Sequence, residues 1–332
     1  MEPYRRSRSL HRQSGARVTG SALSPGATLV REFLRLCVKP ALRPQVSVGA
    51  QRWWTSLCAR ALRVPRAVRC RRLCRESLAI EIVAPEGLRS RSRAILYFHG
   101  GAGVIGSPMT HRTLTSRLAL GGGLEVWVPA YRLAPEHPFP AALDDALTAY
   151  RALRETGLPG SRILLAGDSM GGGLALSLAL RLRDLGDEEE YQVAGLLLLA
   201  PWVDLALSRL TRSPRDPLLS CEWLTWAAAA YAGKTSTHHP AISPLNADLR
   251  GLPPVYLQSS GQDLLYEDAR RLACCLAEAG VDVVHDAYPE LWHVFQLCAW
   301  LAPEAAEAVG HLIDAAQSIL AQRSGHGSGD FA

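Results

Sequence analysis

From residue 78 onwards, short apolar segments of strand length alternate with segments of helical length. Several strand segments are almost continuously apolar, which is typical of parallel strands that are covered on both faces. The pattern therefore predicts an α/β fold with a mostly parallel central sheet flanked by helices. The predicted strands are 78–83, 93–98, 124–128, 162–166, 194–200, 255–259 and 281–288, and the predicted helices are 141–156, 170–185, 266–279 and 302–321.

Composition excludes several other classes of protein. Of the 332 residues, 48% are hydrophobic and 20% are charged, which suits a large core and excludes a disordered, collagen-like or coiled-coil chain. The longest apolar run, 193–203, has 11 residues including Gly195 and Pro201. A membrane-spanning helix needs about 20, so we expect no integral membrane segment.

Two segments depart from the strand–helix alternation. Residues 28–75 place apolar and basic side chains at helical spacing, which predicts amphipathic helices broken near Pro40 and Pro44. Residues 203–250 form an insertion with an Ala-rich helix at 222–232. Ligands of open α/β sheets bind at the carboxyl ends of the strands, so both segments are predicted to cap that edge. The core is then 76–202 with 251–322, preceded by a disordered basic tail at 1–27.

Basic residues are concentrated in the first part of the chain. Residues 1–90 contain 18 of the 36 Lys and Arg residues but only 5 of the 31 Asp and Glu residues. This asymmetry suits nucleic acid, an anionic membrane surface or a solvated basic segment. No nucleic-acid motif accompanies the charge, so we favour the solvated segment and expect no nucleic-acid partner. The N-terminal arginines also resemble a transit peptide, but without a following apolar segment we expect a cytoplasmic location.

The eight cysteines do not indicate a metal site. They lie at positions 37, 58, 70, 74, 221, 274, 275 and 298, without the paired C-x-x-C spacing of zinc sites. We expect them to be free thiols in the core. The His238-His239 pair has no potential ligands close by in sequence, so a loop is favoured over a metal site.

The sequence Gly167-Asp168-Ser169-Met170-Gly171 follows a predicted strand and precedes an apolar helix. It fits G-x-S-x-G in the strand–turn–helix setting of a nucleophile elbow. Side chains two residues before and two after the serine would collide in so tight a turn, which explains the two glycines. The turn would lift the Ser169 hydroxyl above the sheet, at the positive end of the next helix.

A serine nucleophile needs a base, which we expect after it in the sequence together with an acid. His293 lies in the loop between the last strand and the last helix, where a catalytic base belongs. Asp263 directly follows strand 255–259 and is favoured over Glu267 and Asp268, which lie further from the strand end. It would orient the imidazole and stabilise its charged form. We regard the later histidines 238, 239, 285 and 311 as structural or surface groups.

Acyl transfer also needs amide donors for the developing oxyanion. His99-Gly100-Gly101-Ala102-Gly103 follows strand 93–98, and bare glycine backbone can approach a reacting carbonyl closely. We therefore predict that the amides of Gly100, Gly101 and Met170 form the oxyanion hole.

Together these motifs resemble the hormone-sensitive-lipase-like family of α/β hydrolases, the bacterial family IV esterases. The resemblance covers residues 78 to about 320 and includes the Pro-rich segment 131–140. It implies an α/β-hydrolase fold with a helical cap, a triad of Ser169, Asp263 and His293, no cofactor, and hydrolysis of small short-chain carboxylic esters through an acyl-enzyme. The chain departs from the family at three positions. The family usually has glycine at the position of Ala102 and alanine at the position of Met170, and it often has glycine at the position of Val294.

Three other functions are weighed against a carboxylesterase. Gly101, Gly103 and Gly106 match the spacing of a dinucleotide-binding fingerprint. Such a site also needs an acidic residue at the end of a strand to bind the ribose, whereas Glu125 lies at the start of its strand and would not reach it. A non-catalytic small-molecule-binding protein of this fold would not need all three triad residues. An amidase or deacetylase would use the same site.

Strand 281–288 is predicted to be the last in the sheet. Its free edge could pair with a second copy and form a homodimer.

Overall fold

The computed structural model describes residues 23–89, 91–186, 192–210 and 216–325. Its centre is an eight-stranded sheet in the order β1-β2-β4-β3-β5-β6-β7-β8. The strands from β3 to β8 run parallel, and β1 and β2 join antiparallel at one edge, which confirms the predicted α/β-hydrolase fold with a mostly parallel sheet. The strands are β1 Val68–Arg75, β2 Leu78–Pro85, β3 Ala94–Phe98, β4 Glu125–Pro129, β5 Ile163–Asp168, β6 Gly195–Leu199, β7 Val255–Ser260 and β8 Val283–Tyr288.

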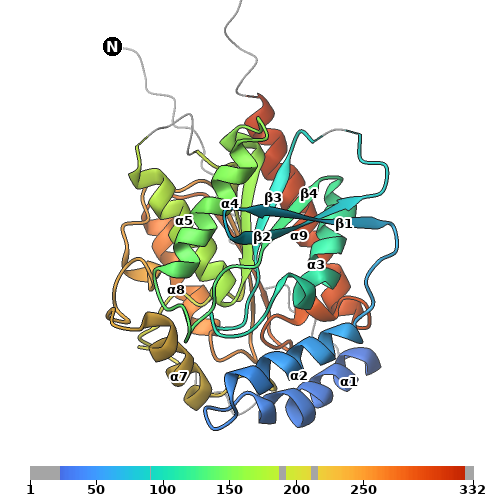
Figure 1. Cartoon of the computed structure of the whole chain (residues 1–332), viewed down its shortest axis with the longest axis vertical. Coiled ribbons are helices and arrows are strands. Elements are labelled where there is room, and N and C mark those ends of the chain that lie inside the picture. The colour runs from blue at the N-terminus through green and yellow to red at the C-terminus, as the bar shows by residue number, and fades with distance from the viewer. Residues whose placement is uncertain (1–22, 90, 187–191, 211–215, 326–332) are drawn as a thin grey trace, which may run out of the picture.

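Helices cover both faces of the sheet (Figure 1). One face packs against α3 (Pro108–Gly122) and α9 (Pro303–Gly325), and the other against α4 (Ala141–Arg154), α5 (Met170–Asp184) and α8 (Tyr266–Glu278). Alternate residues of β3 point into the two resulting cores, for example Leu96 into one and Ile95 into the other. The central strands are apolar at almost every position because both of their faces are buried.

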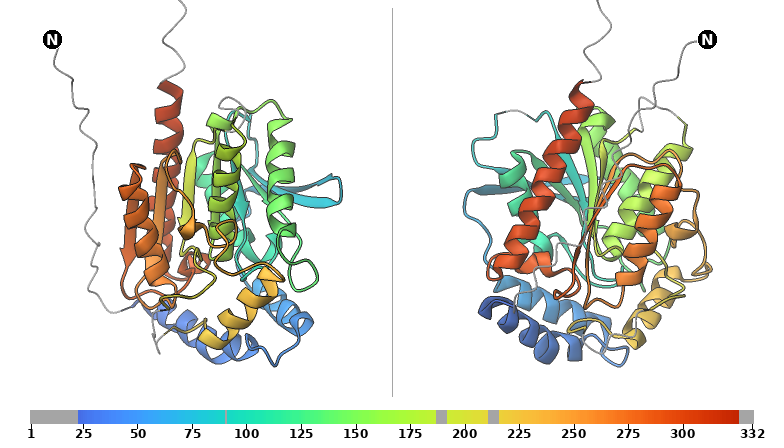
Figure 2. Two further views of the ribbon diagram at one scale, coloured as in Figure 1. Left: turned by 90° about the vertical axis from the view of Figure 1, so that its left-hand side faces the viewer. Right: turned by 180° about the vertical axis from the view of Figure 1, so that it is seen from behind.

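Three further helices lie beyond the carboxyl ends of the parallel strands (Figures 1 and 2). They are α1 (Pro25–Phe33), which continues into the short π-helix η1 (Leu34–Val38), α2 (Val48–Arg60), and α7 (Cys221–Ala232) from the insertion. The indole N–H of Trp223 on α7 donates to Oε1 of Gln51 on α2 at 2.9 Å. The segment between η1 and α2 contains Pro40 and Pro44, so the predicted break is confirmed.

Two boundaries of the predicted N-terminal segments are wrong. Residues 68–75, predicted as part of the cap helices, form strand β1 and pair with β2 along their whole length. The arginines that resembled the wet face of a helix are instead exposed along an edge strand. The second boundary is the end of the disordered tail predicted at 1–27. Residues 1–22 lie outside the described residues, but helix α1 already begins at Pro25. Its N-cap Ser24 bonds Glu304 of α9 at 2.6 and 2.8 Å.

Helix α3 is missing from the predicted elements. It starts with a capping box between Ser107 and Thr110, and Pro108 occupies its first turn. The helix buries Thr113, Thr115 and Ser116 together with its leucines. Polar residues on a buried face weaken the apolar periodicity from which a helix is recognised in a sequence.

The thiols also differ from expectation. All eight cysteines are free, but Cys37, Cys70, Cys74, Cys221 and Cys274 are exposed, and Cys298 is the one that is buried. No described helix combines the length and the apolar composition needed to cross a membrane.

Arg52 of α2 connects the N-terminal helices to the core. Its guanidinium donates to the carbonyls of Val104 and Ala134 at 2.8 and 2.9 Å, and to both carboxylate oxygens of Glu136. The two carbonyls belong to buried residues, whereas the Glu136 side chain is half exposed. The carbonyl bonds should therefore contribute more to stability than the ion pair.

We expect Arg52→Ala to lower the free energy of unfolding by about 1–3 kcal/mol, because the buried carbonyls lose a charged donor. Glu136→Gln removes only an exposed ion pair and should cost less than about 1 kcal/mol. Urea denaturation of both variants tests this difference. Equal losses in the two variants would show that the ion pair, and not the carbonyl bonds, holds α2.

Candidate active site

Ser169 occupies a strained turn between β5 and α5. Its backbone has φ +54° and ψ −124°, a combination that residues other than glycine rarely adopt. Hydrogen bonds on both sides hold the turn: the Ser169 amide donates to the Leu199 carbonyl at 2.8 Å, and its own carbonyl accepts from Gly172 and Trp202. The neighbouring strand and the first turn of α5 therefore stabilise the strained conformation.

The glycines on either side of Ser169 permit this turn. A Cβ atom added to Gly167 would lie 2.3 Å from the Gly171 carbonyl oxygen, and one added to Gly171 would lie 2.1 Å from the Phe98 carbonyl oxygen. Side chains at these two positions cannot be accommodated. The structure thus confirms the steric reason inferred from the G-x-S-x-G spacing.

Asp263 and His293 form a buried pair. Nδ1 of His293 lies 2.7 Å from Oδ2 of Asp263, and because a carboxylate only accepts, Nδ1 carries the proton and Nε2 is left to act as a base. The other oxygen, Oδ1, accepts from the Leu265 amide at 2.8 Å, which fixes the carboxylate. Neither side chain is more than 3% exposed. The sequence proposes Asp263 as the acid and His293 as the base, in two loops that are 30 residues apart. The structure brings these two side chains together.

The other candidates for acid and base are engaged elsewhere. Asp268 accepts from the amides of Val203 and Asp204, and Glu267 pairs with Arg270 on the surface. His285 bonds the Ser259 hydroxyl at 2.7 Å within the sheet. None of them takes the place of Asp263 or His293.

The loop that carries His293 is itself strained. Val294 has φ +51°, an unusual conformation for a β-branched residue, at the position where the resemblance leads one to expect glycine. Val294 is 5% exposed, and Trp292 and Phe295, which lie close to it in the chain, are buried as well. The surrounding core therefore holds the strained residue next to the imidazole.

One of the three predicted oxyanion donors is wrong. The Gly100 amide donates to Oδ1 of Asp168 at 3.0 Å, so it is directed at a buried carboxylate and not at the site of reaction. The contact is close, because a Cβ atom on Gly100 would lie 2.1 Å from Oδ2 of Asp168. Gly101, with φ +116°, follows it in the pocket wall, and Met170 is the first residue of α5. Of the predicted set, Gly101 and Met170 remain.

Asp168, which directly precedes Ser169, organises a buried polar cluster. Besides the Gly100 amide, it accepts from the Tyr97 hydroxyl at 2.7 Å and lies 3.2 Å from Nε2 of His111. Burial alone would raise the pKa of Asp168, but His111 and Tyr97 outweigh it and the net shift is downward. The aspartate therefore stays ionised, and it ties the elbow to the glycine loop, as expected for a structural residue. His111 and Tyr97 were not identified from the sequence.

A second buried carboxylate, Asp216, lies close to the pair. Its Oδ1 accepts from the amides of Leu218 and Leu219, and its Oδ2 accepts from the amide of Leu264, the residue after Asp263. Its carbonyl accepts from Lys39 at 2.6 Å. Asp216 thus joins the insertion, the acid loop and the N-terminal helices. No local sequence motif indicates this role.

The carboxylates around His293 determine its protonation. Burial lowers the pKa of the imidazole, but the charge and hydrogen bond of Asp263, together with the charges of Asp216 and Asp168, raise it by more, so the net shift is upward. The pKa of Asp216 is raised to about 6, by burial first and by the charge of Asp263 second.

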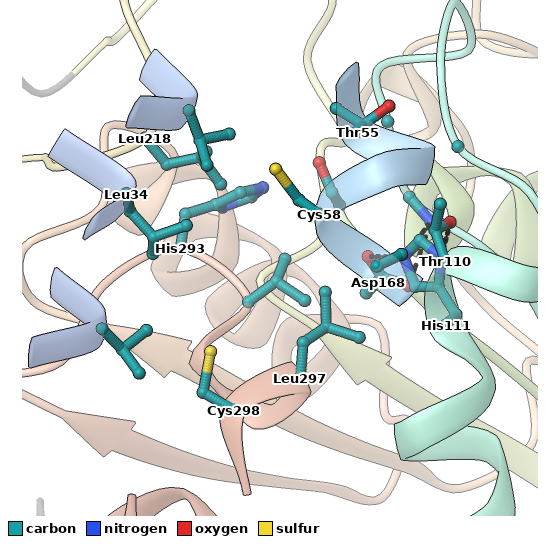
Figure 3. Close-up of a pocket in the computed structure, with 18 of the residues that line it drawn as sticks. Leu34, Thr55, Cys58, Thr110, His111, Asp168, Leu218, His293, Leu297 and Cys298 are labelled. Carbon is teal, nitrogen blue, oxygen red and sulfur yellow. Dashed lines mark hydrogen bonds and ion pairs between the residues drawn. The ribbon is translucent and has the colours of Figure 1, made fainter. Parts of the chain in front are cut away.

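Ser169 and His293 open into one apolar pocket of about 480 Å³. Much of its wall comes from α1, η1, α2 and the segment after His293, including Leu34, Leu297 and Cys298. Figure 3 shows His293 extending from one wall and the Asp168–His111–Thr110 group at another, with Cys58 of α2 between them. A cavity of this volume suits a small organic molecule. Its apolar wall would favour uncharged ligands.

The structure contradicts the dinucleotide alternative. Glu125 lies at the amino end of β4 opposite Ala94, whereas the pocket is at the carboxyl ends of the strands. Glu125 is also paired with Arg71 and Arg91, so it is not available to bind a ribose. Among the described residues there is no cluster of three His, Cys, Asp or Glu side chains arranged to hold a metal ion.

Comparison with known proteins identifies the class to which this site belongs. A family model described as alpha/beta hydrolase fold matches residues 95–297. The chain therefore belongs to the α/β-hydrolase family.

Individual relatives narrow the class. An acetyl-hydrolase of Streptomyces hygroscopicus is 40% identical over 242 residues, which cover 72% of this chain and 79% of that protein. Carboxylesterase NlhH of Mycobacterium tuberculosis is 33% identical over 254 residues, covering 73% and 79%. A solved esterase from the bacterial hormone-sensitive lipase family superposes with a TM-score of 0.84 at 34% identity, covering 90% of this chain and 100% of that one. The protein is a carboxylesterase of the hormone-sensitive-lipase-like kind.

The pKa shift of His293 leads to a prediction about pH. A base must be neutral to act, so kcat/KM should fall as the pH drops through the raised pKa of His293. Asp216→Asn removes one of the charges that raise this pKa. The acid limb of the kcat/KM profile should therefore move to lower pH.

Asp268→Asn is the matched control for this measurement. Asp268 is also a buried carboxylate with a pKa raised to about 7, by burial and then by Asp204, but the charges that raise the pKa of His293 are those of Asp263, Asp216 and Asp168. Its substitution should leave the limb in place. An identical limb in wild type and Asp216→Asn would mean that Asp216 does not influence the base.

Proposed function

We propose that Ser169 is the nucleophile, His293 the general base and Asp263 the residue that orients His293. The observation that carries this proposal is the 2.7 Å Asp263–His293 pair, whose imidazole lines the same pocket as the serine of the strained elbow. A serine, an imidazole and a buried carboxylate in this arrangement form the machinery of acyl transfer.

In the first half of the reaction, Nε2 of His293 takes the proton of the Ser169 hydroxyl as the oxygen attacks the ester carbonyl carbon. The carbonyl oxygen becomes an oxyanion, which the amides of Gly101 and Met170 stabilise at the positive end of α5. The bond to the alkoxy oxygen then breaks, and His293 donates its proton to the leaving alcohol. An acyl group remains on Ser169.

In the second half, a water molecule replaces the alcohol. His293 takes a proton from the water, the resulting hydroxide attacks the acyl carbon, and the second tetrahedral intermediate collapses to release the carboxylic acid. The proton returns to Ser169. Asp263 stabilises the imidazolium in both halves without taking up a proton. No redox step or cofactor takes part in this scheme.

We assign the substrates to small carboxylic esters with short acyl chains. The name of the similar acetyl-hydrolase supports this assignment. Two side chains near the nucleophile support it as well: Ala102 replaces a glycine in the loop that lines the pocket, and Met170 follows Ser169. Ala102 adds bulk at the pocket wall, where an acyl group would bind, and Met170 adds bulk in the buried core beside Ser169. Helices α1, α2 and α7 act as the cap over this site.

Ser169→Ala should abolish turnover of p-nitrophenyl butyrate while leaving the circular dichroism spectrum and the melting temperature nearly unchanged, since the hydroxyl alone is removed. Wild type should hydrolyse acetyl and butyryl esters faster than the palmitoyl ester. The same two proteins should be treated with a fluorophosphonate probe, which labels activated serines. A wild-type protein that stays unlabelled would support a non-catalytic binding protein, and activity in Ser169→Ala would disprove the assigned nucleophile.

We also propose that two copies pair through β8. This strand is the edge of the sheet opposite β1, and an edge strand can pair with the same strand of a second copy. Light scattering at micromolar concentration should give the mass of two chains, and Val283→Pro should shift it to one chain, because the Val283 amide lies on the side of β8 that faces away from β7. A wild-type monomer excludes the pairing.

The cytoplasmic location stays a prediction of the sequence.

A further inference from the structure

The exposed apolar side chains are gathered on one part of the molecule. Among the described residues, seven large apolar side chains are exposed, and six of them lie between positions 29 and 64. The exception is Leu185, just after α5. The six are Leu29, Phe33, Leu36, Trp53, Leu57 and Val64. Scattered exposed apolar residues are normal on a protein surface, but a concentration of this kind marks an interaction site.

The spacing of these residues places them on one face of each helix. Leu29, Phe33 and Leu36 are separated by four and three residues along α1 and η1, and Trp53 and Leu57 by four along α2. Leu29, Leu36 and Trp53 are each more than 60% exposed. The two helices lie beside each other at one end of the molecule in both views (Figures 1 and 2). Together they present an apolar outer surface, which we call the α1–α2 face.

The same segment is strongly basic. Residues 23–67 contain eight Lys and Arg residues and a single acidic residue, Glu32. Arg43, Arg60, Arg63 and Arg66 are exposed, and none of them forms an ion pair with a residue that the structure describes. Exposed Trp, Phe and Leu beside unpaired arginine is the pattern of helices that lie in a lipid–water interface.

The α1–α2 face is continuous with the active-site pocket. Leu29 and Phe33 are exposed and also line the pocket that contains Ser169 and His293. Cys58 and Leu62 line it from the side of α2. A molecule leaving a lipid layer that contacts this face would therefore meet an apolar path to the nucleophile.

We propose that the α1–α2 face docks on an anionic lipid surface. The arginines match the negative headgroups, and the exposed leucines and tryptophan match the boundary of the acyl chains. A second copy of the chain fits less well, because two such faces would bring like charges together. Nucleic acid would match the arginines but leave the leucines without a partner. The docking proposal rests on the proposed function in one respect: esters dissolved in the lipid would reach Ser169 and be hydrolysed there.

The experiment is flotation of the full chain with phosphatidylglycerol vesicles and, in parallel, with phosphatidylcholine vesicles. Wild type should bind the anionic vesicles, and raised salt should weaken this binding because it screens the charges. The double variant Leu36→Ser/Trp53→Ser changes the face without touching the pocket wall and should lower the affinity by about tenfold or more. Arg60→Glu/Arg63→Glu should have a similar effect. Leu185→Ser is the control and should bind like wild type.

A second readout links docking to hydrolysis. Leu36→Ser/Trp53→Ser should hydrolyse soluble p-nitrophenyl butyrate at the wild-type rate, but hexadecyl butyrate in phosphatidylglycerol vesicles more slowly. Ser169→Ala should bind vesicles like wild type and hydrolyse neither ester. Vesicle binding by Ser169→Ala therefore tests docking separately from the assigned nucleophile.

Four results would overturn the proposal. They are no binding to either vesicle, equal binding to both, binding that survives both double variants, and a mass of two chains that Leu36→Ser/Trp53→Ser reduces to one. The third would place the lipid contact elsewhere in the chain, and the fourth would make a second copy the occupant of this face.

Discussion

The close approach of backbones at Ser169 is the constraint on which the active site depends. Gly171 packs against the Phe98 carbonyl, so α5 can start directly above β3 and the serine can take a conformation that is otherwise unfavourable. This contact brings the glycine loop after β3 and the first turn of α5 to the same point. Without it, Ser169 and the glycine loop would not line the same pocket.

Buried carboxylates connect this point to the rest of the molecule. Asp168 joins the elbow to the Gly100 amide and to α3 through His111, and Asp263 fixes His293. Asp216 ties the loop after Asp263 to the insertion and, through Lys39, to the N-terminal helices. Each accepts hydrogen bonds that offset part of the cost of burying a charge. The cap and the base are thus held by one network, which explains how residues of the insertion can act on the pKa of His293.

The correct and incorrect predictions have different physical causes. The sequence could propose Ser169, Asp263 and His293 for one site because each follows a recognisable strand, and the carboxyl ends of parallel strands meet at one edge. The Gly100 assignment failed because the direction of an amide depends on its partner, and Asp168 accepts from it. Strand β1 was mistaken for helix because its arginines follow no clear period, and only its pairing with β2 makes it a strand. Asp216 has no local signature, since its neighbours come from distant parts of the chain.

By itself, the sequence determined the α/β class, the tight turn at Ser169 and the proposal of Asp263 and His293 as acid and base, because these depend on local periodicity, glycine spacing and order along strands. The tertiary structure decided that the Gly100 amide points at Asp168, how three carboxylates share the surroundings of one imidazole, and that exposed apolar residues of α1 and α2 are left uncovered by the rest of the described chain. These properties depend on contacts between segments far apart in the chain. A side chain's exposure, its hydrogen-bond partner and its pKa are set by what packs against it, and no local pattern contains that information.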